Sequence, residues 1–255
     1  MSEIMLKAEN IAKRFGGIVA TDDLTLTVAQ GDLHAVIGPN GAGKTTLIAQ
    51  LSGQLVPDFG RIYFNDRDIT TLPMYKRSAR GLARSFQITS LFLDLSVLDN
   101  VALAVQAHAG SSFRFWRNAR LDKGLRDPAR AALERVGLLD RADRPASALS
   151  HGEHRLLELA MALAGNPRML LLDEPMAGLG PEESARMVDM LRVLKQEFTI
   201  LLVEHDMEAV FALADKITVL VYGRVIASGT VDEIRTNEQV RDAYLGDIEE
   251  GAVND

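Results

Sequence analysis

The stretch Gly38-Pro39-Asn40-Gly41-Ala42-Gly43-Lys44-Thr45 decides how this chain folds. An apolar run from Leu33 to Ile37, with His34 inside it, precedes the stretch and is typical of a strand, whereas residues 44–51 are typical of a helix. Strand, glycine-rich loop and helix in this order form the setting in which the pattern G-x-x-x-x-G-K-[ST] binds phosphate. The glycines let successive N–H groups turn toward an anion, and the helix N-terminus adds about half a positive charge. The stretch therefore predicts a nucleoside-triphosphate site.

In a loop of this kind two side chains act beside the backbone. The Lys44 ammonium reaches the β- and γ-phosphates, and the Thr45 hydroxyl is a ligand for Mg²⁺. The candidate nucleotide contacts are the loop and the first helical residues: Gly38, Pro39, Asn40, Gly41, Ala42, Gly43, Lys44, Thr45 and Thr46.

The composition limits the classes of function. The 255 residues suffice for one large domain, or for one domain that carries a subdomain. A formal net charge of −7 argues against broad binding to nucleic acids or anionic lipids, and the absence of cysteine excludes disulfides, thiolate metal sites and cysteine nucleophiles. No apolar stretch is long enough to cross a bilayer, and the first residues lack the features of a secretion signal. We therefore expect the chain to stay in the cytosol, docked on another component.

Strand-like and helical runs alternate in a way that predicts an α/β fold. We expect strands at 4–8, 24–28, 33–37, 61–64, 83–86, 169–172, 199–203, 216–221 and 224–227, and helices at 97–107, 128–136, 153–164, 181–197, 207–214 and within 231–245. The pattern favours a P-loop NTPase core with a mixed, largely parallel sheet, an N-terminal antiparallel β portion and an inserted α-helical subdomain. Within this single domain the nucleotide-binding core would span 1–87 and 166–246, the helical subdomain 88–165 and a frayed tail 247–255.

Two adjacent carboxylates end the buried apolar run at 169–172. Asp173 and Glu174 would emerge at the edge of a parallel sheet where ligands bind. Phosphoryl transfer needs one carboxylate to hold Mg²⁺ and can use a second to position and deprotonate the attacking water. We assign the first role to Asp173 and the second to Glu174. The alternative is a polar strand end that begins a turn at Pro175, and the phosphate loop upstream weakens it.

Two further polar residues follow apolar strands and would reach the same edge. The Gln87 amide could bridge Mg²⁺ and the attacking water, and the His205 imidazole could contact the γ-phosphate. Taken singly, each is better explained as a polar residue at the end of a strand than as a catalytic group.

The segment Leu149-Ser150-His151-Gly152-Glu153 begins a helix. Ser150 and Glu153 have the S-x-x-E spacing of a capping box, which is a structural role. A serine hydroxyl, an exposed glycine backbone and a helix N-terminus also form an anion site. The two roles are compatible.

These motifs, in this order, resemble those of the ATPase subunit of an ABC transporter: GPNGAGKT, Gln87, LSHGE, LLLDEP and His205. The resemblance extends from Leu6 to about Gly246. It implies ATP and Mg²⁺ as ligands, Phe15 stacked on adenine, Gln87 as a sensor of Mg²⁺ and of the membrane partner, Glu174 as general base and His205 at the γ-phosphate. It also implies a head-to-tail dimer, in which residues 150–153 close over ATP bound by the other ATPase subunit. From the residues alone, Phe15 could equally be part of the core.

The chain departs from the family pattern at three positions. His151 and Glu153 stand where the pattern LSGGQ has glycine and glutamine, and Gly180 stands where the family commonly has aspartate. Histidine at position 151 cannot adopt the strained backbone dihedrals that glycine allows. The loss of the aspartate at position 180 affects the expected communication between the two ATP sites, but not ATP binding.

Finer details are similar to the branched-chain amino-acid importer subgroup, including RFGG at 14–17, RSFQ at 84–87 and EHDM at 204–207. The resemblance implies a second ATPase subunit, either a copy or a sibling, two transmembrane permease subunits and, indirectly, a periplasmic substrate-binding protein. It implies a peripheral location on the cytoplasmic face of the inner membrane of a prokaryote. Importers of urea or short amides, and exporters, are the alternatives.

The sequence allows more than one role for each of two segments. The basic, aromatic residues between Ser111 and Arg126 could pack on the helical block, lie near lipid headgroups or, least in keeping with the net charge, bind nucleic acid. The apolar residues of 91–98 could dock a helix of the permease or belong to the core.

Two other classes of protein carry the same loop. A soluble ABC ATPase of DNA repair or translation would show coiled-coil insertions, zinc ligands or a second ATPase unit, and the chain has none of these. A P-loop kinase or GTPase would have no use for the LSHGE segment, and no NKxD pattern is present. We therefore expect no nucleic-acid partner.

Overall fold

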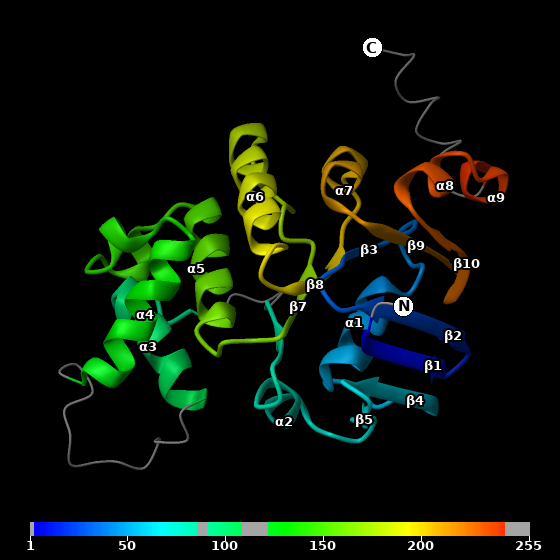
Figure 1. Ribbon diagram of the computed structural model, residues 1–255, viewed down its shortest axis with the longest axis horizontal. Helices are drawn as coiled ribbons and strands as arrows, with labels where there is room; N and C mark the ends of the chain where they lie inside the picture. Colours follow the sequence, from blue (N-terminus) through cyan, green and yellow to red (C-terminus); the bar gives the residue numbers. More distant parts are fainter. Residues whose placement is uncertain (1–2, 86–90, 109–121, 243–255) are drawn as a thin grey trace.

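The computed structural model describes residues 3–85, 91–108 and 122–242. It contains two β-sheets and a cluster of helices (Figure 1). Gln87, the strand end at Phe86 and most of the basic aromatic segment, residues 111–121, lie outside the described residues.

A six-stranded sheet forms the centre, in the order β10-β9-β3-β8-β7-β6. Its strands are β3 (Leu33–Ile37), β6 (Leu82–Arg84), β7 (Met169–Asp173), β8 (Thr199–Val203), β9 (Lys216–Val221) and β10 (Arg224–Gly229). The inner neighbours pair in parallel, and β10 pairs antiparallel with β9. Every residue of β3, β7 and β8 is buried, as expected for strands covered on both faces. The predicted mixed, largely parallel sheet is confirmed.

A four-stranded antiparallel sheet packs beside the central one, in the order β2-β1-β4-β5. Its strands are β1 (Ile4–Phe15), β2 (Ile18–Ala29), β4 (Phe59–Phe64) and β5 (Arg67–Asp68). The first two strands are each 12 residues long, more than twice the length predicted. Irregular register between Ala8 and Ile11 interrupts the alternation of apolar residues, and Asn10 and Asp23 have positive φ. The sequence pattern therefore hides the continuity of the hydrogen-bonded ladder.

Two apolar layers lie on opposite faces of the central sheet. The helix α1 (Lys44–Ser52) and the antiparallel sheet share one buried cluster with Leu171 and Leu201, while Leu170 and Leu202 face a cluster formed by the helices α3, α5 and α6. Alternate residues of one strand thus point into different layers, as the pleat requires.

Three helices form the cluster on the left of Figure 1: α3 (Val97–His108), α4 (Lys123–Arg135) and α5 (His151–Leu163). They pack on one another through a shared apolar core. The prediction that α4 starts at Pro128 is wrong, because the Asp122 carboxylate accepts the Gly124 N–H at 2.9 Å and caps the helix five residues earlier, with Pro128 inside it.

The remaining helices are shorter or flank the sheet. They are α2 (Met74–Ser78), α6 (Pro181–Leu194), α7 (Met207–Leu213), α8 (Val231–Arg235) and α9 (Glu238–Val240), with 3₁₀ turns at Leu139–Arg141 and Ala146–Ala148. The helix α6 ends before the predicted residue 197, because the chain must turn into β8 at Thr199. Among the residues described, no helix is both long and apolar enough to span a bilayer.

Candidate nucleotide-binding site

The loop between β3 and α1 is held by two glycines that no other residue could replace. Gly38 has φ 153° and Gly43 has φ 103°, both in the region that favours glycine. A Cβ atom on Gly38 would overlap the carbonyl oxygen of Leu220, and one on Gly43 would overlap that of Ala20. The two carbonyls belong to β9 of the central sheet and β2 of the antiparallel sheet, so the loop lies tightly against both sheets.

Lys44 begins α1 and is buried. Its ammonium donates hydrogen bonds to the carbonyls of Gly38 at 2.6 Å and Pro39 at 3.1 Å, so the side chain folds back across the loop. Burial lowers the pKa of Lys44, and the negative charges of Glu174 and Asp173 oppose this effect. The cation therefore lies close to both carboxylates and to the loop that would hold phosphates.

Asp173 ends β7 in a buried position, opposite a buried cation from β6. Arg84 donates to its Oδ2 atom at 3.0 Å and also to the amide oxygen of Gln54 at 2.7 Å. Burial is the main cause that raises the pKa of Asp173, and Arg84 opposes it. A role for Arg84 at the site was not predicted from the sequence, although a basic residue at the end of a strand next to Asp173 could have indicated an ion pair.

The second oxygen of Asp173, Oδ1, is buried and makes no hydrogen bond. A buried carboxylate oxygen needs a partner, so the site suits a hydrated cation or a water molecule. Within the described ranges, no group of three or more His, Cys, Asp or Glu residues could hold a metal ion. This donor set fits Mg²⁺, which keeps several waters and takes one or two protein ligands together with substrate phosphates.

Glu174 follows in the left-handed region, with φ 48°. This conformation is costly for a residue other than glycine, and such strain gathers at functional sites. The Glu174 N–H donates to the Val203 carbonyl at 2.9 Å, which fixes the turn to the end of β8.

Glu204 links this turn to His205. The Glu204 side chain is fully buried; its Oε1 accepts the Met176 N–H at 2.9 Å, and its Oε2 accepts the His205 N–H at 3.0 Å. The His205 ring is exposed, with Nδ1 3.6 Å from Glu204 Oε2. The sequence did not predict a role for Glu204. The only indication of one was a charged residue directly after a buried strand.

The segment before α5 forms the predicted capping box. The Ser150 N–H donates to Glu153 Oε2 at 2.9 Å, and the Glu153 N–H donates to the Ser150 hydroxyl at 3.1 Å. His151 lies in the first turn with negative φ, so this position does not need glycine. Its ring instead packs against Gly178, since a Cβ built there would lie 3.3 Å from His151 Nε2.

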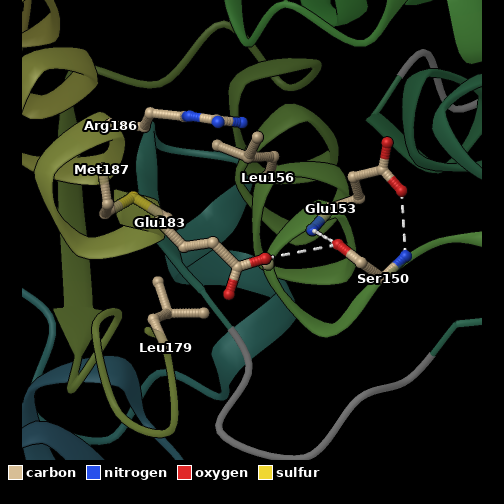
Figure 2. A pocket seen from close by; sticks show the side chains of 8 residues that line it. Ser150, Glu153, Leu156, Leu179, Glu183, Arg186 and Met187 are labelled. Atoms are coloured by element: carbon tan, nitrogen blue, oxygen red, sulfur yellow. Dashed lines mark hydrogen bonds between the residues drawn. The ribbon is translucent and has the colours of Figure 1, made fainter. Parts of the chain in front are cut away.

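A cavity of about 230 Å³ opens beside this segment (Figure 2). Its walls come from α5 and α6 and from the loop between β7 and α6: Ser150, Gly152, Glu153, Leu156, Leu179, Glu183, Arg186 and Met187. Neither the phosphate loop nor Asp173 is among the residues that line it.

Phe15 ends β1 with 48% of its surface exposed, and the Lys13 ammonium lies 5.8 Å from the ring centroid. The alternative that Phe15 fills the core is therefore wrong. The apolar residues of 91–98 differ in their exposure to solvent. Phe92 is 57% exposed, whereas Val97 and Leu98 are fully buried in the helical core.

Comparison with known proteins agrees with this geometry. Residues 21–177 match the family model described as "ABC transporter", and residues 224–250 match the one described as "Branched-chain amino acid ATP-binding cassette transporter". The first range contains the phosphate loop, Ser150–Glu153 and the Asp173-Glu174 pair.

Two curated relatives cover nearly the whole chain. The high-affinity branched-chain amino acid transport ATP-binding protein LivG of Escherichia coli is 36% identical over 97% of this chain and 100% of its own length. The lipopolysaccharide export system ATP-binding protein LptB of Escherichia coli is 34% identical over 95% of this chain and 97% of its own.

Solved structures share the fold. The ADP conformation of MJ1267, an ATP-binding cassette of an ABC transporter, superposes with a TM-score of 0.85 at 31% identity, over 96% of this chain and 100% of that one. The dimeric cassette MJ0796 has a TM-score of 0.76 over 89% and 99%, and at 24% identity it supports the fold alone. With its phosphate loop, paired carboxylates and capped LSHGE helix, this chain belongs to the ATP-binding cassette family of ABC transporter ATPases.

Proposed function

We propose that this ATPase energises an importer of branched-chain or other amino acids. The observation that carries the proposal is that a family model specific to branched-chain amino acid cassettes matches residues 224–250, beyond the part common to all cassettes. The 36% identity with LivG over nearly the full length of both chains supports the same substrate class.

We propose a role in hydrolysis for each residue at the site. Residues 38–46, with Lys44 among them, hold the phosphates of ATP, and the exposed Phe15 ring stacks on adenine. Thr45 and Asp173 would hold Mg²⁺, with Gln87, outside the described residues, as a further ligand, and the ion would neutralise charge on the β- and γ-phosphates. Glu174 deprotonates the attacking water, and His205 contacts the γ-phosphate.

A second ATPase subunit completes each site. Ser150, Gly152 and Glu153 line a cavity that the phosphate loop does not line, and we expect these residues, with His151 between them, to contact ATP bound by a partner. The dimer is head-to-tail and is formed either with a copy of this chain or with a sibling. The chain divides into a nucleotide-binding core at 1–87 and 166–246 and a helical subdomain at 88–165, with residues 247–255 outside the described part.

The permease docks in an apolar groove between the core and the helical cluster. The groove encloses about 350 Å³ and includes Met74, Tyr75, Phe92, Leu103 and Ala107. Phe92 and Tyr75 expose large apolar surfaces there, which is unusual unless a partner covers them. The proposed occupant is a short helix from one of two transmembrane subunits. The proposed location is peripheral, on the cytoplasmic face of a prokaryotic inner membrane, with a periplasmic binding protein as an indirect partner.

The test is a pull-down of the tagged chain from detergent-solubilised membranes, followed by mass spectrometry and by uptake of labelled leucine in cells that lack the chain. We expect two hydrophobic subunits, a second ATPase and a loss of leucine uptake. Recovery of nucleic acid without any membrane protein would contradict the proposal. Recovery of a permease with unchanged amino-acid uptake would favour urea, short amides or export, and the 34% identity with LptB is the observation behind export.

A further inference from the structure

One of the chain's own carboxylates occupies the N-terminus of the LSHGE helix α5. Glu183 lies in the first turn of α6, 33 residues after Ser150, and its Oε1 accepts a hydrogen bond from the Ser150 hydroxyl at 3.4 Å (Figure 2). A Cβ atom built on Gly152 would lie 2.5 Å from the same Oε1 atom. The glycine therefore permits an anion to rest directly on the backbone at the start of α5.

The other oxygen of Glu183 faces a second helix end. Its Oε2 accepts the Gly180 N–H at 3.5 Å, at the N-terminus of α6. Helices α5 and α6 have 13 and 14 residues, and each presents about half a positive charge at its N-terminus. The Glu183 carboxylate thus lies between the N-termini of α5 and α6, and its negative charge balances the partial positive charge of both.

We propose that Glu183 is an autoinhibitory gate, a stand-in for the γ-phosphate that must leave α5 before the partner's ATP can bind there. The inference rests on the proposed function, in which Ser150 and Gly152 meet ATP of the second subunit. A carboxylate and a phosphate repel each other at contact distance, so the two anions cannot share this place.

The surroundings allow the gate to open. The cavity of about 230 Å³ lies beside Glu183, and Arg186, three residues further along α6, lines the same cavity. This space leaves room for the carboxylate to turn away from Ser150. The loop that leads from Glu174 into α6 also contacts the LSHGE segment, through Gly178 and His151.

The test compares Glu183→Gln with the matched control Glu182→Gln. Both remove one charge from the first turn of α6, but Glu182 is exposed and pairs with Arg186 at 3.8 Å instead of contacting Ser150. The amide in Glu183→Gln can still cap α6. Because a ligand's apparent affinity falls by the fraction of time that its site is blocked, Glu183→Gln should lower the ATP concentration for half-maximal hydrolysis about threefold to tenfold.

Two further readouts test the proposal, one on the purified ATPase assembly and one on the isolated chain. Dimer formation by light scattering, in a Glu174→Gln background, should also need about threefold to tenfold less ATP with Glu183→Gln, whereas binding of a fluorescent ATP analogue to the phosphate loop of the isolated chain should not change. A Glu183→Gln assembly within twofold of the Glu182→Gln control, or one that needs more ATP, overturns the gate. A wild-type assembly that neither hydrolyses ATP nor dimerises with it overturns the proposed function and the gate together.

Discussion

At the scale of single residues, the proposed catalytic groups lie around the strained turn at Glu174. Its positive φ and its hydrogen bond to Val203 hold it next to Asp173, whose buried Oδ1 atom makes no hydrogen bond and is the proposed contact for Mg²⁺. Asp173, Glu174 and Glu204, which are buried or strained, thus lie at the ends of β7 and β8. The Glu204 carboxylate accepts the His205 N–H and so holds the backbone at His205 in place.

Glu174→Gln should retain binding of MgATP and lose most hydrolysis. The amide keeps the size of the side chain but cannot accept the proton of the attacking water, so kcat should fall on the order of 10²- to 10⁴-fold. Phosphate release, measured together with the dissociation constant of the nucleotide, checks this expectation. Unchanged turnover in the variant would remove Glu174 as the base.

His34 makes the protein sensitive to acid. The ring is fully buried in β3, its Nε2 lies 2.8 Å from the Thr218 hydroxyl, and its Nδ1 has no partner. Burial lowers the pKa of His34 to about 4, from 6.5 in an unfolded chain. The unfolded state therefore binds a proton first as the pH falls, and this destabilises the folded state progressively from pH 6.5 down to about 4, in total by about 3 kcal/mol.

His34→Leu should remove this dependence, so that the loss in free energy of unfolding between pH 6.5 and pH 4.5 becomes smaller by about 2–3 kcal/mol than in the wild type. The slope, obtained from urea unfolding at several pH values, is the readout, because the absolute stability also changes with packing. Equal slopes in His34→Leu and wild type would contradict the assignment.

At the scale of elements, the loop between β3 and α1 depends on close approach to the two sheets. Gly43→Ala would place a methyl group against the Ala20 carbonyl at a positive φ. We expect the free energy of unfolding to fall by about 2–4 kcal/mol and MgATP binding to be lost. Thermal unfolding and nucleotide titration check both effects. Gly17→Ala is the control, because Gly17 has open space and an ordinary φ; similar losses in both variants would show that the contact is not the cause.

Elements with strong local signals were predictable from the sequence. The capping box of α5 and the buried runs of β3, β7 and β8 are in place, because each depends on neighbours within a few residues. The length of β1 and the start of α4 were not predictable. A bulge at Asn10 breaks the alternation in β1, and Asp122 caps α4 ahead of a proline that would ordinarily mark a helix start.

At the scale of the whole molecule, the groove between the core and the helical cluster should decide assembly. Phe92→Asp puts a charge on its exposed apolar wall and should reduce the permease recovered in the pull-down about tenfold or more, with ATP binding by the isolated chain unchanged. The matched control Val193→Asp alters an exposed apolar residue on α6, away from the groove. Equal recovery with Phe92→Asp and wild type would exclude the groove as the docking surface.

The sequence by itself determined the phosphate loop, the strand that ends in Asp173-Glu174 and the helix that starts at Ser150, because each is encoded by residues next to one another along the chain. Only the tertiary structure decided which distant side chains complete them. Arg84 pairs with Asp173 across 89 positions, Glu204 reaches Met176 across 28, and Glu183 reaches Ser150 across 33. Side-chain periodicity states which face a residue occupies but not which residue faces it, and these partners exist only once the sheet order has brought their strands and helices together.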